Sequence, residues 1–255
     1  MIERAITISL ARKFDVDEYS IEREFIQLIF LRNFYRLAGS VNIYFKGGTA
    51  IHYLLHSFRF SEDLDFTATE TKPEVKKLVR NTLGESNLEA PGLVGELLTE
   101  TMESMVYRLN FPTELSIRPL TIRLEFSFRE KPLSRRVSVI ETELPVSPYP
   151  MVVHFDFEEI LAEKLRALLI RGKGRDVFDC WYLLSKDIQP KVDLIRKKML
   201  FYKQDFSIDR LKKTIEGMDL QALKDDLEKF LPKSHRKVIG ELPAMLLYKI
   251  KAYRL

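Results

Sequence analysis

The sequence predicts an α/β (α+β) protein with a mixed β-sheet core and helices, followed by an all-helical C-terminal part. Two observations support this prediction. β-favouring runs alternate with helical stretches up to a cluster of prolines, and beyond it apolar residues recur at helical spacing to the end of the chain. The cluster consists of Pro145, Pro148 and Pro150. We therefore predict two domains, residues 1–150 and residues 151–255.

The elements of the first domain are predicted from apolar periodicity and from turn residues. Residues 2–37 form an opening helical stretch, and a further helix lies near residues 73–83. Strands are predicted at residues 41–45 and 64–67 and in the β-rich region 105–139. The segment from Gly84 to Gly95 is predicted as a loop or an interrupted helix.

A glycine turn opens the most informative part of the chain. Residues 46–50 read Lys-Gly-Gly-Thr-Ala, and an apolar segment at residues 50–57 then has room for two helical turns. Gly47 and Gly48 allow backbone N–H groups to approach a phosphate closely, and Thr49 begins a helix whose N-terminus attracts anions. We predict a cradle for a triphosphate here, although Gly-Gly also occurs in ordinary turns.

Two aspartates follow in the next predicted strand, shortly after Arg59 and Ser61. Side chains alternate along a strand, so Asp63 and Asp65 point to one face while the apolar residues beside them point into a core. Like charges this close repel each other unless a cation lies between them, and oxygen ligands favour Mg²⁺ or Mn²⁺. We predict a divalent metal site, and the alternative is a solvated Asp-x-Asp at a sheet edge.

The two motifs resemble those of the AbiEii/AbiGii-type toxin family, part of the nucleotidyltransferase superfamily found in toxin–antitoxin and phage-defence (abortive infection) systems. Family members typically carry Lys-Gly-Gly-Thr-Ala and then Arg-x-Ser-x-Asp-x-Asp-Phe, which occur here at residues 46–50 and 59–66. The wider superfamily has Gly-Ser where this chain has Gly48 and Thr49, and threonine keeps the hydroxyl. The resemblance implies a nucleotidyltransferase-type sheet and an enzyme that transfers a nucleoside monophosphate from an NTP, releasing pyrophosphate.

A third carboxylate is needed if the site also activates an incoming hydroxyl. The strand predicted at residues 120–128 has one apolar face, and its other face carries Arg123 and Glu125. If this strand lies beside the strand of Asp63 and Asp65, Glu125 completes the metal cluster, and in the superfamily the third acid also comes from a later strand. The alternative is a solvent-facing Glu125 paired with Arg123 or with a base on a neighbouring strand.

The C-terminal domain places a lysine inside an apolar helix face. In the helix predicted at residues 155–170, Lys164 falls within the apolar stripe and Arg166 lies opposite. A lysine in this position either extends its ammonium group to solvent or meets a buried anion, such as a nucleotide phosphate. The family resemblance favours the anion, because members carry a site lysine in a matching helix.

The following helix, predicted to begin after Gly172, carries Asp176 and Asp179 near its start. Acidic residues there also stabilise the helix dipole, which is the ordinary explanation. The sequence Arg-Asp-Val-Phe-Asp is nonetheless similar to the family's Arg-Asp-x-x-Asp segment. By this resemblance we expect Asp176 to be a site residue that orients Lys164 or the nucleotide, with Asp179 as a secondary candidate.

The implied reaction gives each candidate residue a role. The metal ligands are Asp63, Asp65 and Glu125, and the catalytic set adds Lys164 and Asp176. The nucleotide-binding residues are Lys46, Gly47, Gly48, Thr49, Arg59, Ser61 and Lys164. Arg59 and Lys164 neutralise charge that develops on the phosphates, and Glu125 helps to activate the acceptor hydroxyl. By analogy with the wider family, a phosphate added to Ser61 would repel the metal-bound NTP.

Charge and composition bear on the acceptor and on the compartment. Residues 151–255 contain 22 Lys and Arg against 16 Asp and Glu, a net charge of +6, and the preceding residues carry −2. The basic groups considered as phosphate contacts for RNA are Lys197 with Lys198, Lys212 with Lys213, and residues 233–237. Lysine-rich helix faces also serve solubility alone. A single cysteine, no membrane span and no signal peptide suit a protein of the reducing cytoplasm.

By resemblance to the family's toxins, we expect the acceptor to be RNA, with the 3′ end of tRNA as the favoured acceptor. We further expect growth arrest as the outcome and a cognate antitoxin as a partner. Two alternatives keep the nucleotide but change the function. One is transfer of the nucleoside monophosphate to a protein hydroxyl (NMPylation), and the other is a nucleotide-binding module without catalysis. Both aspartates of the Asp-x-Asp pair are present, which disfavours the non-catalytic alternative.

Overall fold

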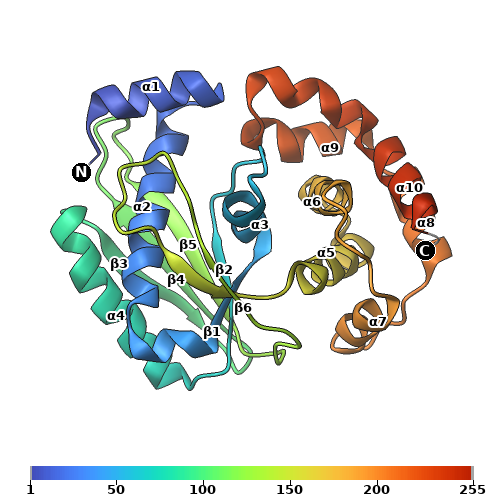
Figure 1. The fold of residues 1–255 in the computed structure, drawn as a ribbon, viewed down its shortest axis with the longest axis horizontal. Coiled ribbons are helices and arrows are strands. Elements are labelled where there is room, and N and C mark those ends of the chain that lie inside the picture. Colours follow the sequence, from blue (N-terminus) through green and yellow to red (C-terminus); the bar gives the residue numbers. More distant parts are fainter. Residues whose placement is uncertain (1, 254–255) are drawn as a thin grey trace. The chain divides into compact units, whose positions relative to one another are not determined.

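The computed structural model describes residues 2–253, and the chain divides into two compact units (Figure 1). Unit 1 comprises Met1–His56 and Phe60–Phe155, and unit 2 comprises Ser57–Arg59 and Asp156–Leu255. Unit 1 contains the sheet and unit 2 is helical, which confirms the mixed α/β class predicted from the sequence.

Unit 1 is built on a mixed seven-stranded sheet in the order β3-β4-β5-β2-β1-β7-β6. The strands are β1 (Ile43–Lys46), β2 (Leu64–Ala68), β3 (Val94–Glu100), β4 (Ser104–Phe111), β5 (Leu120–Ser127), β6 (Arg136–Val139) and β7 (Met151–His154). The pairs β2–β5 and β1–β7 are parallel, whereas the other neighbours are antiparallel. Both strands predicted around the motifs, β1 and β2, are confirmed.

Four α-helices belong to unit 1: α1 (Arg4–Phe14), α2 (Glu18–Tyr35), α3 (Gly47–Leu55) and α4 (Lys72–Glu89). The predicted opening helical stretch is confirmed, but it is divided into α1 and α2. Asp15 ends α1 in the left-handed conformation (φ 56°), and the Asp17 carboxylate then caps α2 by accepting a hydrogen bond from the Ser20 N–H at 2.6 Å. A short 3₁₀ helix, η1 (Ala38–Asn42), leads into β1.

One face of the sheet packs against α2 through aromatic rings. The ring of Phe34 in α2 lies 5.6 Å from that of Phe66 in β2 and 6.1 Å from that of Phe126 in β5. Phe66 also stacks on Phe126 at 4.9 Å, and Phe45 of β1 lies in register beside Phe66. Because side chains alternate along a strand, the polar residues next to these phenylalanines lie on the opposite face.

Two strands were missed by the sequence analysis. Only the first two residues of β3 fall in the segment predicted as a loop or interrupted helix, and the others lie before the predicted β-rich region 105–139. All residues of β3 are exposed, so the strand has no alternation of buried and exposed positions. Gly84, at the other end of that segment, lies inside α4. β7 directly follows Pro150, where only helices were predicted, and its four residues are too few for a periodic signal.

Unit 2 contains α5 (Phe157–Arg171), α6 (Gly174–Ser185), α7 (Val192–Leu200), α8 (Ile208–Glu216), α9 (Leu220–Leu227) and α10 (Leu242–Ala252), with two 3₁₀ helices, η2 (Glu228–Phe230) and η3 (Lys233–Glu241). α5 ends at Gly172, which adopts the left-handed conformation (φ 60°), as its role as a stop signal predicts. None of the helices in the described part of the chain combines the length and the apolar composition needed to span a bilayer.

Candidate active site

The Lys-Gly-Gly-Thr-Ala motif forms the end of β1 and the first turn of α3. The helix begins at Gly47, two residues before the predicted start at Thr49. Gly47 has φ 80°, and a Cβ atom on this residue would collide with the carboxylate of Asp65. Glycine is therefore required both by the backbone conformation and by the close approach of the Asp65 side chain.

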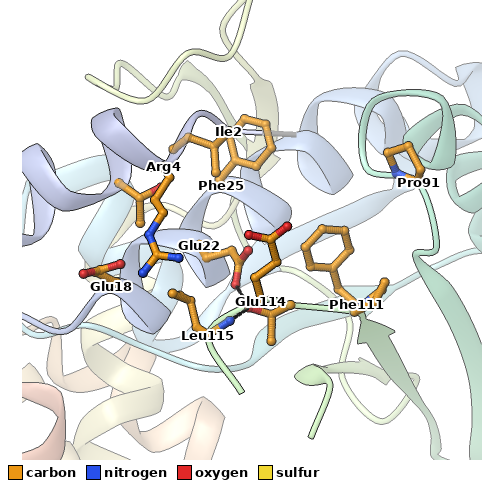
Figure 2. Close-up of a pocket in the computed structure, with 12 residues that line it drawn as sticks. Ile2, Arg4, Glu18, Glu22, Phe25, Pro91, Phe111, Glu114 and Leu115 are labelled. Carbon is orange, nitrogen blue, oxygen red and sulfur yellow. Dashed lines mark hydrogen bonds between the residues drawn. The ribbon is translucent and has the colours of Figure 1, made fainter. Parts of the chain in front are cut away.

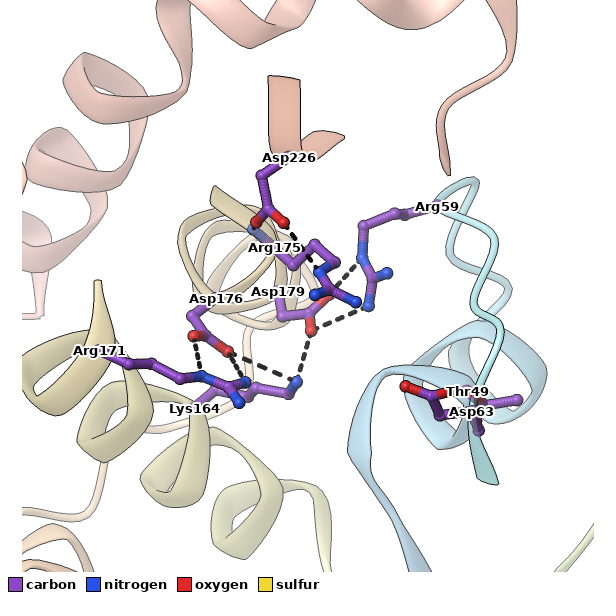
Figure 3. Close-up of polar contacts among 9 residues, drawn as sticks. All are labelled: Thr49, Arg59, Asp63, Lys164, Arg171, Arg175, Asp176, Asp179 and Asp226. Carbon is purple, nitrogen blue, oxygen red and sulfur yellow. Dashed lines mark hydrogen bonds and ion pairs between the residues drawn. The ribbon is translucent and has the colours of Figure 1, made fainter. Parts of the chain in front are cut away.

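Thr49 connects the glycine turn to the aspartate strand. Its Oγ1 hydroxyl donates a hydrogen bond to the backbone carbonyl of Asp63, and Thr49 itself is only 1% exposed. Figure 3 shows these two residues next to each other. The Thr49 hydroxyl, which replaces the serine hydroxyl of the wider superfamily, thus holds the first turn of α3 against Asp63, the residue that precedes β2. Ser61 lies half-buried in the same loop before β2.

Strand register brings three charged residues together on the sheet. Lys46 at the end of β1 pairs with Asp65 in β2, and Asp65 pairs in parallel register with Glu125 in β5. Residues in register lie on the same face, so these three side chains form a row opposite the phenylalanine face. The condition stated for Glu125, that its strand lies beside the aspartate strand, is met.

Glu125 also forms the pair named in the alternative interpretation. Its Oε2 accepts a hydrogen bond from Nη2 of Arg123 at 3.1 Å, and both side chains are about half exposed. Leu64 and Phe66, which flank Asp65, are fully buried, as predicted. Glu125 therefore lies in register with Asp65, as a third metal ligand requires, and it also pairs with Arg123, as the alternative interpretation states.

The donor set on this face suits a hard divalent cation. Asp63, directly before β2, and Asp65 and Glu125 in adjacent strands offer carboxylate oxygens only, which Mg²⁺ and Mn²⁺ prefer. In the described part of the chain, no three His, Cys, Asp or Glu side chains stand in the geometry of a bound metal ion. The fit therefore rests on ligand chemistry and on strand register.

Gln27, in the middle of α2, supports the loop before Asp63 and was missed by the sequence analysis. It is 1% exposed, and its Nε2 donates hydrogen bonds to the carbonyls of Ser61 and Glu62 at 3.1 and 3.0 Å. Its Oε1 accepts a hydrogen bond from the hydroxyl of Tyr53 in α3 at 2.6 Å. The only signal for Gln27 in the sequence is its place in an otherwise apolar helical run. The need for a glutamine becomes clear only from its hydrogen-bond partners.

A second group of charged residues lies within unit 2 (Figure 3). Asp179 of α6 accepts two hydrogen bonds from the Arg59 guanidinium, at 2.8 and 3.0 Å, and its Oδ2 lies 2.7 Å from Nζ of Lys164 in α5. Asp176 accepts two hydrogen bonds from Arg171 at 2.8 Å each, and its Oδ1 lies 3.8 Å from Nζ of Lys164. We call these five residues the Lys164 cluster.

The carboxylates of the Lys164 cluster are buried and paired with cations. Asp176 and Asp179 are fully buried, and the Lys164 side chain is 12% exposed. Burial alone would raise the pKa of Asp179, but Arg59 and Lys164 outweigh it and hold that pKa below its usual value. Burial would likewise lower the pKa of Lys164, yet the carboxylates of Asp179 and Asp176 raise it. Three cations and two carboxylates leave the cluster with a net charge of +1.

The cluster resolves how Lys164 is accommodated in its apolar helix face. The ammonium group meets a buried anion, as one of the two alternatives stated, and the anions that it contacts are the carboxylates of Asp179 and Asp176. The secondary candidate, Asp179, makes the short contact with Lys164, whereas Asp176 is held mainly by Arg171. Arg59 joins this cluster because Ser57–Arg59, between α3 and β2, belongs to unit 2.

One of the predicted RNA contacts is wrong. Lys198 is fully buried, and its Nζ lies 2.7 Å from Glu159 and 3.2 Å from Glu163, so it cannot reach a phosphate of a nucleic acid. Arg166, expected on the polar side of α5, is 9% exposed and lies over the ring of Tyr202 at 4.0 Å. The face of α5 that looked polar in sequence is therefore covered by the region of α7.

A glycine at the start of a helix, an Asp-x-Asp motif at the start of a strand and a third carboxylate in register on the next strand are the features that the motifs of a nucleotidyltransferase predict. A family model described as "Nucleotidyl transferase AbiEii toxin, Type IV TA system" matches residues 29–239. The chain belongs to this AbiEii family of nucleotidyltransferase toxins, which confirms the resemblance seen in the motifs. A search of curated protein sequences gives no match.

Solved structures share the fold over nearly the whole chain. JHP933 from Helicobacter pylori is 23% identical, covers 94% of this chain and 95% of its own, and has a TM-score of 0.59. A putative nucleotidyltransferase from H. pylori is also 23% identical, with coverages of 94% and 98% and a TM-score of 0.60. MenT4, a nucleotidyltransferase toxin from Mycobacterium tuberculosis, is 17% identical, with coverages of 97% and 90% and a TM-score of 0.61.

Proposed function

We propose that this AbiEii-family nucleotidyltransferase uses Mg²⁺ to transfer a nucleoside monophosphate from an NTP to RNA, with the 3′ end of tRNA as the favoured acceptor. The observation that carries the proposal is the row of Lys46, Asp65 and Glu125 on one sheet face, next to the glycine start of α3. This row combines a cation, two carboxylates and a helix N-terminus where a triphosphate with a bound metal needs them.

In the proposed reaction, the acceptor hydroxyl oxygen bonds to the α-phosphorus of the NTP, and the bond from that phosphorus to pyrophosphate breaks. Asp63, Asp65 and Glu125 would hold the metal ion, which supplies Lewis-acid stabilisation of the phosphoryl oxygens. Glu125 accepts the proton of the acceptor hydroxyl. The backbone N–H groups of Gly47 and Gly48 bind the phosphates, and the ammonium group of Lys46 neutralises part of their charge.

The Lys164 cluster supplies positive charge in this proposal. Its net charge of +1 and the raised pKa of Lys164, which keeps the ammonium protonated at neutral pH, suit the neutralisation of phosphate charge. Asp179 orients Lys164 and Arg59 through its three contacts, and Asp176 positions Arg171. Arg59 precedes Asp63 by four positions, so one short segment of chain carries residues of both candidate regions.

The RNA acceptor is supported by the basic excess of residues 151–255 and by the family resemblance. Lys197, Lys213, Lys233 and Lys237 remain exposed, in contrast to the buried Lys198. The Type IV toxin–antitoxin description of the family supports a cognate antitoxin as a partner, and we place the activity in the cytoplasm. Phosphorylation of Ser61, in the loop before Asp63, would oppose NTP binding by adding negative charge.

The test is to incubate the purified protein with Mg²⁺, each α-³²P-labelled NTP in turn, and total cellular RNA or protein. We expect label in a tRNA-sized band, and the nucleotide that gives it is the substrate. Label in a protein band instead would replace the RNA acceptor by a protein hydroxyl. No label in either fraction, with or without a cell extract that supplies a missing partner, would contradict transferase activity and favour a nucleotide-binding module. Undiminished labelling by Ser61→Glu would count against regulation at Ser61.

A further inference from the structure

A hollow in unit 1 lies apart from the motif residues. It has a volume of about 390 Å³ and is lined by the start of α1, the first turns of α2 and the residues that follow β4 (Figure 2). Volumes of about 300–1,000 Å³ are typical of sites for small ligands. Phe25 and Phe111 contribute aromatic surface to its wall.

The charged groups of this hollow are predominantly acidic. Figure 2 shows the carboxylates of Glu18, Glu22 and Glu114 and the guanidinium of Arg4 around it. Three carboxylates and one guanidinium give this lining a net charge of −2. Glu18 and Glu22 lie one turn apart on α2, and Glu114 follows β4, so separate elements bring the negative charges together.

One of these carboxylates is incompletely satisfied. The Oε2 oxygen of Glu18 is buried and accepts no hydrogen bond within the part of the chain that the structure describes. Such buried, unpaired acceptors are rare in native proteins and point to a missing partner. Glu22 accepts a hydrogen bond from the Thr113 hydroxyl, yet burial raises its pKa and the charge of Glu114 adds to this effect.

We infer that this hollow binds an organic cation with an apolar body. An amidinium, guanidinium or ammonium group would pair with Glu18, Glu22 and Glu114, and the apolar body would pack on the aromatic wall. A bare metal ion fits less well, because the lining is largely apolar. Two sources carry this chemistry, a free small molecule and an arginine side chain of a partner protein, and the experiment below distinguishes them.

The probe is benzamidine, a cation on an aromatic ring, compared with the neutral and nearly isosteric benzamide. Titration calorimetry on the full chain should show saturable benzamidine binding at millimolar concentration and at least tenfold weaker binding of benzamide. Glu18→Gln and Glu114→Gln should each weaken benzamidine binding about tenfold. Arg4→Ala should strengthen it about threefold, because a competing cation is removed.

Glu85→Gln is the matched control, since Glu85 is exposed on α4 and remote in sequence from the hollow, and it should leave benzamidine binding unchanged. Thermal unfolding of each variant verifies the fold, and Arg4→Ala keeps all three carboxylates and so tests the site independently. A tripeptide acetyl-Leu-Arg-Leu-amide that binds more tightly than benzamidine would assign the cation to a partner protein, and the reverse order would assign it to a small molecule. Equal binding of benzamide and benzamidine, or unchanged binding in both glutamine variants, would overturn the inference.

Discussion

The two candidate regions use aspartates in opposite ways. In unit 1, Asp65 is half-buried in a strand beside the carboxylate of Glu125, so the sheet register gathers negative charge. In unit 2, Asp179 is fully buried between Arg59 and Lys164, so ion pairs surround each carboxylate. Strand pairing places side chains whatever their charge, whereas a buried carboxylate requires cations. We therefore expect substitutions in the first region to abolish chemistry and those in the second to disturb folding as well.

The largest effect is expected for Asp63→Asn combined with Asp65→Asn. Removal of two metal ligands should lower the rate of nucleotide transfer by about three orders of magnitude, because the stabilisation that a metal gives to phosphoryl transfer amounts to several kcal/mol. The measurement is the initial rate of label uptake from the NTP that the wild type uses.

The control for this pair is Asp205→Asn combined with Asp209→Asn, which removes two exposed aspartates of unit 2. It should retain the wild-type rate, and both double variants should unfold at the wild-type temperature within a few degrees. Transfer activity that survives the loss of Asp63 and Asp65 would contradict the assignment of the chemistry to the first region.

Asp179→Asn tests the second region. It leaves Arg59 and Lys164 buried with one carboxylate partner fewer, and the loss of a partner from a buried ion pair costs about 3–5 kcal/mol of unfolding free energy. Urea unfolding followed by the fluorescence of Trp181, the single tryptophan, reports on unit 2 directly. A variant that unfolds at the wild-type urea concentration would show that the cluster is not needed for folding.

The same cluster predicts how stability depends on pH. Burial raises the folded pKa of Asp179, but Arg59 and Lys164 lower it further than burial raises it. The ionised Asp179 therefore stabilises the fold above its unfolded pKa of about 3.9, and this stabilisation is lost as pH falls through the folded pKa. The folded pKa of Lys164 is raised by Asp179 and Asp176 against burial, so its contribution is present below about pH 10.4 and is lost as pH rises through the folded value. Asp179→Asn should show a smaller loss of stability in acid than the wild type, measured by urea unfolding below pH 4.

Gly47→Ala sharpens the account of the first region. The new Cβ would collide with the Asp65 carboxylate, at a residue with φ 80°. We expect the free energy of unfolding to fall by about 2 kcal/mol and the transfer rate to fall as well. Gly84→Ala is the matched control, because nothing lies within 4 Å of its added Cβ and the residue is inside α4. The free energy of unfolding of this control should rise by about 0.5–1 kcal/mol, because alanine is favoured over glycine inside a helix. Equal behaviour of the two variants in urea unfolding and transfer would contradict the proposed close packing.

The effects expected at the supporting residue Gln27 are indirect, because its side chain contacts the loop before Asp63. Gln27→Leu leaves the Tyr53 hydroxyl and two loop carbonyls without this partner, and we expect a loss of about 1–3 kcal/mol and about tenfold weaker metal binding. Tyr53→Phe removes only the hydroxyl and should cost about 1 kcal/mol with little effect on metal binding. If the two variants bind Mg²⁺ equally well, the loop is not positioned by Gln27.

The sequence was sufficient to predict the parts that depend on local pattern. The strands of Asp65 and Glu125 follow from alternation, and the helix break at Gly172 follows from its stop signal. The register between those two strands was only a condition in the sequence, because strand pairing is set by contacts between distant segments.

Other features could not be predicted because they depend on tertiary partners. Lys198 was predicted as a surface lysine, but it is buried against Glu159 and Glu163, and Gln27 received no role because its partners lie in a distant loop. The choice between Asp176 and Asp179 as the closer partner of Lys164 depends on the packing of α6 against α5. Periodicity places all of these residues on helices but cannot say what lies opposite them.

The assignment of the metal site to Asp63, Asp65 and Glu125 is tested directly by a manganese titration followed by electron paramagnetic resonance. This method detects free Mn²⁺, and bound Mn²⁺ is obtained by difference. The account predicts saturable binding by the wild type and by the Asp205→Asn, Asp209→Asn control. It predicts that the Asp63→Asn, Asp65→Asn variant loses this binding while it remains folded. Unchanged Mn²⁺ binding by that variant would contradict the assignment of the metal site to the row of carboxylates on β2 and β5.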